Sequence, residues 1–258
     1  MQPNMESITE PKVRDWSGYS SAVLAEAYML VGLLTKILSE ERPPPKAFGL
    51  RKPKYNFYDR AACYFLKVEL CKSYRDIEGI LKALSGLYSD FGISMVPDHN
   101  TIWRTVDLMD EDYLKRVNLR VVEAKARNVG FDATGLSNNE YLRWLDEKGS
   151  EKRKGKWEKL HTCSDTDELF ILSWLVTDSN VPDMTQLKAL AVPVAETYGI
   201  LRGVGDKGYC SRENNQTIAD LGGDPYIDFK DNCCIARAKR CPEWKKKFYM
   251  WKERPEEF

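Results

Sequence analysis

Two aspartates, Asp132 and Asp206, each close a short apolar run and are followed at once by a glycine-containing turn. This pattern is typical of a buried strand whose last residue projects from the edge of a sheet. Two such strands lying side by side would hold both carboxylates at one place. Carboxylate pairs of this kind bind Mg²⁺ and leave coordination positions for water and phosphate oxygens. A single aspartate before a turn is usually only a turn former, so the predicted metal site depends on the pair.

Short apolar runs and helical patterns alternate in the part of the chain that carries these aspartates. After the Asp132 strand, the sequence predicts strands over residues 140–145, 157–164 and 169–177, the last with the composition of a central strand. A helix capped by Asp183 or Thr185 follows, then the Asp206 strand, a helix, a strand over residues 226–230 and a last helix. The strand–helix–strand crossover makes the two aspartate strands parallel. The fold class predicted from this order is α/β, a ribonuclease-H-like mixed sheet with flanking helices.

An all-α region precedes the predicted sheet. Ser73 followed by Asp76 is a capping-box variant that starts one helix, and residues 97–100 start another. Ahead of these, residues 22–38 predict a helix, and residues 42–54 form a proline-rich linker with five basic residues and no acid. We therefore divide the chain into residues 1–56 (helix and linker), 57–127 (helical, helix-turn-helix-like) and 128–258 (α/β core).

The helix that begins near residue 99 has a polar free face that would suit a groove of duplex DNA. A plain helical bundle with a solvated face is the alternative, and His99 alone is more often a capping residue than a reader of bases. The residues expected to contact DNA are Arg51, Lys52 and Lys54 of the linker and His99, Asn100, Thr101 and Arg104 of the helix.

The composition of the chain bears on three further questions: a nucleic-acid partner, disulfides or a zinc site, and a membrane-spanning segment. Thirty-nine basic residues balance thirty-nine acidic ones, so net charge gives no argument for a nucleic-acid partner, and only the local basic runs do. Seven cysteines without a repeated spacing fit reduced thiols in the cytoplasm better than disulfides or a zinc set. Residues 22–38 are too short and too charged to cross a membrane.

Several segments resemble the insertion-sequence DDE transposases. They are residues 73–78 and 96–102 of the helical region, Phe131-Asp132-Ala133-Thr134-Gly135, Lys159-Leu160-His161 with residues 171–177, and Gly205-Asp206-Lys207-Gly208-Tyr209. The resemblance covers about residues 50–250. It implies metal-dependent DNA strand cleavage and transfer with two Mg²⁺ (or Mn²⁺) ions. Asp132 would bridge the two ions, and Asp206 would complete the ligand shell of one of them. It also implies double-stranded DNA as partner (element ends and target), with a homodimer as a candidate assembly. Lys207 is expected to contact the scissile phosphate, with plain exposure as the alternative.

The third acid of that family, a glutamate on a helix after the last strand, is expected after a Tyr and an Arg at short spacings. The four late glutamates lack this context: they are Glu243, Glu253, Glu256 and Glu257. We therefore expect a chain that is truncated before the third acid and defective in strand transfer. The alternative is a non-catalytic DNA-binding remnant. His161 is expected to be a hydrogen-bonded strand histidine rather than part of the site.

Overall fold

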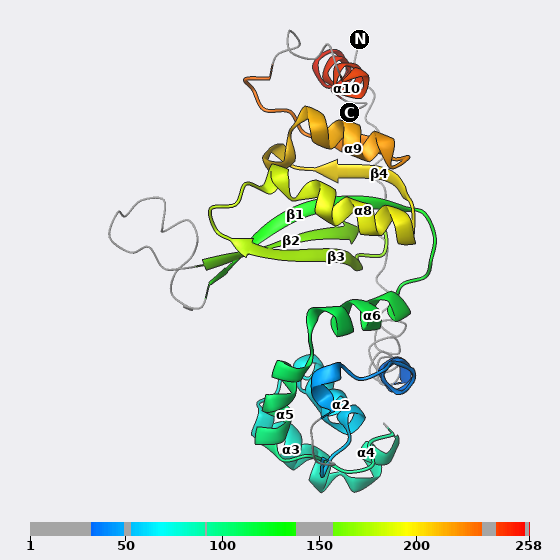
Figure 1. Ribbon diagram of the computed structural model, residues 1–258, viewed down its shortest axis with the longest axis vertical. Helices are drawn as coiled ribbons and strands as arrows, with labels where there is room; N and C mark the ends of the chain where they lie inside the picture. Colours follow the sequence, from blue (N-terminus) through cyan, green and yellow to red (C-terminus); the bar gives the residue numbers. More distant parts are fainter. Residues whose placement is uncertain (1–31, 49–52, 91, 138–156, 234–240, 256–257) are drawn as a thin grey trace, which may run out of the picture. The chain divides into compact units, whose positions relative to one another are not determined.

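The computed structural model describes residues 32–48, 53–90, 92–137, 157–233, 241–255 and 258. The chain divides into two compact units, Met1–Val121 and Val122–Phe258 (Figure 1). We call the described residues of the first the helical unit and those of the second the sheet unit. The predicted strand over residues 140–145 lies outside the described residues. No helix within these ranges is long and apolar enough to cross a membrane.

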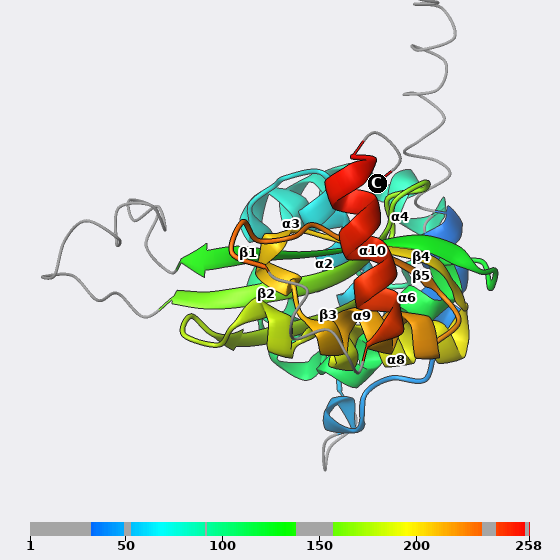
Figure 2. The same ribbon diagram turned by 90° about the horizontal axis from the view of Figure 1, so that it is seen from above.

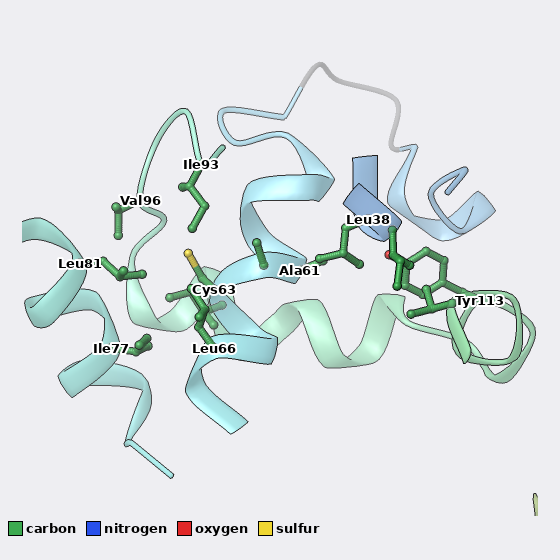
Figure 3. Close-up of a cluster of buried hydrophobic side chains, with 13 residues drawn as sticks. Leu38, Ala61, Cys63, Leu66, Ile77, Leu81, Ile93, Val96 and Tyr113 are labelled. Carbon is green, nitrogen blue, oxygen red and sulfur yellow. The ribbon is translucent and has the colours of Figure 1, made fainter. Parts of the chain in front are cut away.

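Short helices make up the helical unit. Residues 32–40 are helical, and the elements that follow are η1 (Pro45–Ala47), α2 (Phe57–Glu69), α3 (Tyr74–Ala83), α4 (Ser85–Asp90), α5 (His99–Thr105), η2 (Val106–Leu108) and α6 (Glu111–Val121). Ala61, Cys63 and Leu66 of α2 are almost completely buried. Around them pack apolar side chains of the other elements, among them Leu38, Ile77, Leu81, Ile93, Val96 and Tyr113 (Figure 3). Helix α2 is therefore the element around which this unit is packed.

Side-chain caps fix where two of these helices begin. Ser73 Oγ accepts a hydrogen bond from Asp76 N at 3.1 Å, and Asp76 Oδ2 accepts one from Ser73 N at 3.4 Å. The capping box predicted before α3 is therefore present. At the start of α5, Asp98 Oδ1 accepts a hydrogen bond from Thr101 N at 3.0 Å. Both helices pack against α2, so their orientations are set by burial as well as by these caps.

Five strands of the described residues form one mixed sheet in the order β3-β2-β1-β4-β5. They are β1 (Arg127–Ser137), β2 (Trp157–Asp165), β3 (Ile171–Asp178), β4 (Ile200–Gly205) and β5 (Asp224–Ile227). The helical elements of this unit are η3 (Asp183–Thr185), α8 (Leu187–Thr197), η4 (Lys207–Tyr209), α9 (Arg212–Asp220) and α10 (Pro242–Glu253). Strand β2 is antiparallel to β1 and β3, whereas β4 is parallel to β1 and β5. This arrangement confirms the predicted ribonuclease-H-like α/β fold class, preceded by helices.

Strand β1 is longer than predicted. Its pairing with β4 stops at Phe131 opposite Gly205, but its pairing with β2 continues to Ser137 opposite Trp157. The prediction that the strand ends at Asp132 is therefore wrong. The reason is that the antiparallel partner still satisfies the backbone of β1 beyond the point where the parallel partner ends. Figure 2 shows β1 and β2 running on together past β4 and β5.

Strand β3 is an edge strand among the described residues, not the central strand that its composition predicted. One of its faces is covered, since Ser173 Oγ donates a hydrogen bond to Leu190 O of α8 at 2.8 Å. Towards the end of the strand the opposite face is exposed, with Val176 54% exposed. An apolar run of this length shows that a strand is β-forming, but it does not show how many neighbours the strand has.

Helices α8 and α9 lie side by side over one face of the sheet, α8 against β2 and β3 and α9 against β4 and β5 (Figure 1). Helix α10 packs on α9 and β5 (Figure 2). It is held there by Phe229, whose ring centroid lies 4.7 to 5.5 Å from those of Trp244, Phe248 and Trp251. Apolar burial therefore fixes the helices relative to the strands that carry the candidate site.

Gly203 of β4 is a point of very close approach to α9. A Cβ on this residue would lie 2.8 Å from Ile218 Cδ1 and 3.1 Å from Ile218 Cγ2. Any side chain here forces α9 or the Ile218 rotamer to shift. Because β4 leads directly into Asp206, this packing also fixes the place of that aspartate.

Gly203→Ala is expected to lower the free energy of unfolding by about 1–3 kcal/mol, the usual cost of overpacking a core. Adding Ile218→Val, which removes Cδ1, should restore part of the loss. Gly79→Ala is the matched control, because an added Cβ on Gly79 in α3 meets nothing within 4 Å. That change should be neutral or stabilising by up to about 1 kcal/mol. Denaturant titration measures all three, and equal effects at Gly203 and Gly79 would contradict the packing argument.

Candidate functional site

The pairing of β1 with β4 places Asp132 and Asp206 next to each other. Phe131 pairs with Gly205 in the parallel register, and each aspartate is the next residue in the chain. Neighbouring strands lie about 4.8 Å apart. The register therefore brings the two candidate metal ligands within reach of one cation, at the place where β4 ends.

Both carboxylates are held at one oxygen and open at the other. Asp132 Oδ1 accepts a hydrogen bond from Ala133 N at 2.8 Å, and Asp206 Oδ1 accepts one from Gly208 N at 2.8 Å. No donor among the described residues contacts Oδ2 of either aspartate. Both residues are exposed. Two free, hydrated carboxylate oxygens are ligands that Mg²⁺ and Mn²⁺ accept, so the residues present fit a divalent ion.

A buried tyrosine packs behind the two aspartates. Tyr209 ends η4 and is almost fully buried, with its ring centroid 6.1 Å from that of Phe131. The pKa of Tyr209 is raised, first by burial and then by the carboxylates of Asp183, Asp132 and Asp206. Three carboxylates therefore act on one hydroxyl group, and Asp183 belongs to the surroundings of the candidate site.

Asp183 was considered from the sequence only as a helix cap, and the structure gives it other partners. Its Oδ1 lies 2.9 Å from Lys159 Nζ of β2 and 3.7 Å from His161 Nδ1. His161 is fully buried, and its Nε2 lies 2.8 Å from Thr177 Oγ1, as expected for a hydrogen-bonded strand histidine. Burial lowers the pKa of His161, against the raising effect of Asp183. No spacing in the sequence predicts this cluster, because the loop between β3 and α8 brings Asp183 back to β2.

A further carboxylate that sequence reasoning missed, that of Asp228, lies at the same end of the sheet as Asp206. Strand β5 pairs with β4 up to Gly205, and Asp228 is the next residue after that pairing, with its N donating to Gly205 O at 3.0 Å. Lys207 Nζ lies 3.9 Å from Asp228 Oδ2 and 3.5 Å from Asp231 Oδ1. These ion pairs are exposed and therefore weak. The phosphate contact expected for Lys207 stays a prediction.

Within the described part of the chain, no three His, Cys, Asp or Glu side chains are grouped so as to hold a metal ion. Glu243 and Glu253 lie on α10, which packs against α9 and β5. Glu256 and Glu257 lie outside the described residues. A third acid beside Asp132 and Asp206 is therefore not found among the residues that the structure describes.

The residues expected to contact DNA differ in how free their side chains are. Asn100 and Arg104 are exposed and lie four positions apart on α5, which puts them on one side of the helix, with Trp103 beside them, 55% exposed. Lys54 is exposed as well, and its Nζ lies 5.0 Å from the centroid of the Tyr55 ring. Arg51 and Lys52 lie outside the described residues.

His99 and Thr101 have partners within the helical unit. His99 Nδ1 lies 2.7 Å from Glu78 Oε2, which also accepts a hydrogen bond from His99 N at 2.8 Å. Thr101 Oγ1 donates to Asp98 Oδ2 at 2.8 Å. The pKa of Glu78 is lowered to about 2, chiefly by the hydrogen bond from Lys82 and then by those from His99, against the raising effect of burial. Both side chains therefore help to hold α5 in place, and any DNA contact they make stays a prediction.

The order of the strands and the two paired aspartates define a ribonuclease-H-like domain with an acidic edge. The family model of the transposase DDE domain matches residues 123–257, more than half of the chain. The chain therefore belongs to the DDE transposases. Comparison with curated proteins finds no match. Family membership supports a role in DNA transposition and recombination of a mobile element, and DDE transposases generally use divalent metal ions.

Glu78→Gln is expected to lower the melting temperature of the helical unit at neutral pH. Because the folded-state pKa is lowered, the carboxylate's contribution is fully present above its ordinary value of 4.5 and is lost as the pH falls from there to about 2. The difference between the two proteins should shrink over that interval in thermal melts. Glu69→Gln, at an exposed position of α2, is the control. A difference that stays constant down to the lowest pH would contradict the role given to Glu78.

Proposed function

We propose that this chain acts as an insertion-sequence transposase, which cleaves and joins DNA strands in a metal-dependent reaction at Asp132 and Asp206. The observation that supports this most directly is the β1–β4 register, which ends at Phe131 and Gly205 and sets the two aspartates side by side. Each carries one carboxylate oxygen without a donor among the described residues. Membership of the DDE transposases supports DNA as the substrate.

Bound divalent ions would activate a water or a 3′-hydroxyl and stabilise the leaving oxygen of an in-line attack on phosphorus. Asp132 and Asp206 would hold them through their open Oδ2 atoms. Because both aspartates are exposed, a DNA backbone can approach them without any part of the sheet opening. Lys207, also exposed, would contact the scissile phosphate. Tyr209 is buried behind the pair and excludes water from that side.

Duplex DNA would be held by the helical unit and the linker before α2. Asn100 and Arg104 form the free face of α5 and would enter a groove, while His99 and Thr101 keep the start of that helix in place. The basic residues of the linker would contact phosphates, and they are Arg51, Lys52 and Lys54. Since the net charge of the chain is zero, this local distribution carries the electrostatic attraction.

A second candidate is a DNA-binding protein without catalytic activity. It is favoured by the fact that the described residues contain no group of three acidic, histidine or cysteine side chains arranged as metal ligands. Phosphoryl transfer of this type depends on positioning and on charge stabilisation, so a poorly held second ion would leave little activity. We therefore propose that the 258-residue chain binds metal and DNA but transfers strands poorly.

Asp132→Asn and Asp206→Asn should each weaken Mn²⁺ binding at least about tenfold, because each removes one of two charged ligands. Electron paramagnetic resonance of free Mn²⁺ during titration measures the dissociation constant. Asp220→Asn, the same change at an exposed position at the end of α9, should leave the affinity unchanged. Mn²⁺ affinity that is insensitive to both site substitutions would show that the metal site is misassigned.

The 258-residue chain, incubated with element-end DNA and Mn²⁺, should retard the duplex in gels yet yield little joined product. Retardation should weaken with salt, by about 0.9 in the log–log slope for each phosphate contacted. Asp132→Asn should abolish any residual product and leave retardation unchanged. Efficient joining that requires Asp132 would show that the chain is fully active. Normal retardation with no Mn²⁺ binding would favour the non-catalytic candidate.

A further inference from the structure

Asp183 of η3 lies against the turn that carries Asp206. A Cβ on Gly208 would lie 2.9 Å from Asp206 Oδ1 and 3.2 Å from Asp183 Oδ2. The two carboxylates therefore flank the same glycine. Only a residue without a side chain lets both approach this close, and the backbone N–H of Gly208 is already bonded to Asp206.

Other contacts tie η3 to η4 independently of the carboxylates. Asn214 of α9 is almost fully buried, and its Nδ2 donates to Met184 O of η3 and to Tyr209 O of η4, both at 2.8 Å. One amide group thus joins the two short helices. Asp183 and Asp206 are therefore held at a fixed separation and cannot drift apart to relieve their repulsion.

Lys159 anchors Asp183 on the other side. Its Nζ lies 2.9 Å from Asp183 Oδ1 and donates to Val181 O at 3.0 Å. Both members of the pair are largely shielded, with the Lys159 and Asp183 side chains 18% and 26% exposed. Such a pair is screened less by solvent than one at the surface. Its two charges therefore act over several ångströms on Asp206.

Asp183 and Asp132 belong to different faces of the sheet, although the charges of both act on Tyr209. Side chains alternate along a strand, so Asp132 points to the face opposite Phe131. Ala133 pairs with His161, which puts His161 on the Phe131 face, the face covered by α8, and there it lies 3.7 Å from Asp183. Asp183 therefore meets the candidate site at the Asp206 turn.

Three carboxylates around Tyr209 with a single shielded lysine leave an excess of negative charge. This excess of negative charge does not stabilise the fold, because a carboxylate beside Asp206 adds repulsion to the folded chain. A bound divalent cation would turn the same excess into attraction. The arrangement therefore makes sense for a chain that holds a cation at Asp206.

We propose that Asp183 tunes the metal site from beside the turn that carries Asp206: its charge, offset by that of Lys159, sets the affinity for a divalent cation. This inference rests on the proposed function, because it takes Asp132 and Asp206 as the ligands. Lys159 and Asp183 then have opposite effects on cation binding although they form one ion pair.

The test is the Mn²⁺ dissociation constant of the full chain, compared among Asp183→Asn, Lys159→Gln and the double variant, with melting temperatures measured alongside. Asn is close to Asp in size, and Gln is an uncharged polar side chain one bond shorter than Lys, so each change chiefly removes the charge. Asp183→Asn should weaken binding about three- to tenfold, the effect of one charge several ångströms from a divalent ion. Lys159→Gln should tighten binding by a similar factor, and the double variant should lie close to the unsubstituted chain. Asp220→Asn is again the control.

A purely structural ion pair gives a different result, because breaking it from either side disturbs the same turn. Both single variants would then weaken binding, or leave it unchanged, and either result overturns the proposal. A loss at Asp183→Asn as complete as at Asp132→Asn would make Asp183 a direct ligand and overturn it as well. If Asp132→Asn and Asp206→Asn themselves leave Mn²⁺ affinity unchanged, the proposed function fails first, so the two failures are distinguishable.

Discussion

The candidate site depends on one backbone constraint, the parallel pairing of β1 with β4 that stops at Phe131 and Gly205. Strand β4 ends there, whereas β1 continues along β2, so Asp132 stays on a rigid strand while Asp206 begins a turn. A slip of one residue in β4 would turn its side chains to the other face of the sheet. The close packing of Gly203 against Ile218 opposes such a slip, because any larger residue at that position forces Ile218 to shift.

Behind the two exposed aspartates, several buried polar side chains of the sheet unit are paired. Ser173 bonds to α8, and Asn214 joins η3 to η4. Buried polar groups that are fully paired specify one arrangement, since any other leaves a donor or acceptor unsatisfied. Not every buried polar atom of this unit is paired: among the described residues, Asn215 Oδ1 and Trp244 Nε1 have no hydrogen-bond partner. The paired groups hold η3 and η4 together behind the site, and the carboxylate oxygens at the edge stay open to solvent or to a cation.

The sequence is sufficient to predict the main strands, the parallel relation of the two aspartate strands and the caps of α3. These features depend on local patterns and on the handedness of crossovers. The sequence does not predict where β1 ends, because pairing with a second strand extends it. It also does not predict that β3 is an edge strand, because composition does not show how many neighbours a strand has. Asp183 and Asp228 were missed as neighbours of Asp206 for a related reason. Asp183 is brought towards Asp206 by a loop and Asp228 by a strand pairing, and residue spacing in the sequence predicts neither.

Repulsion among the carboxylates links metal binding to the stability of the sheet unit. In the folded chain Asp183, Asp132 and Asp206 all act on Tyr209, whereas in the unfolded chain they are far apart and hydrated. A cation that binds only the folded form therefore stabilises it by mass action. The turn that carries Asp206 must also stay in place without the cation. Two contacts without net charge hold it there: the hydrogen bonds of the Asn214 amide and the packing of Tyr209 on Phe131. Neutral contacts thus set the geometry, and charged ones set how strongly that geometry prefers a bound metal.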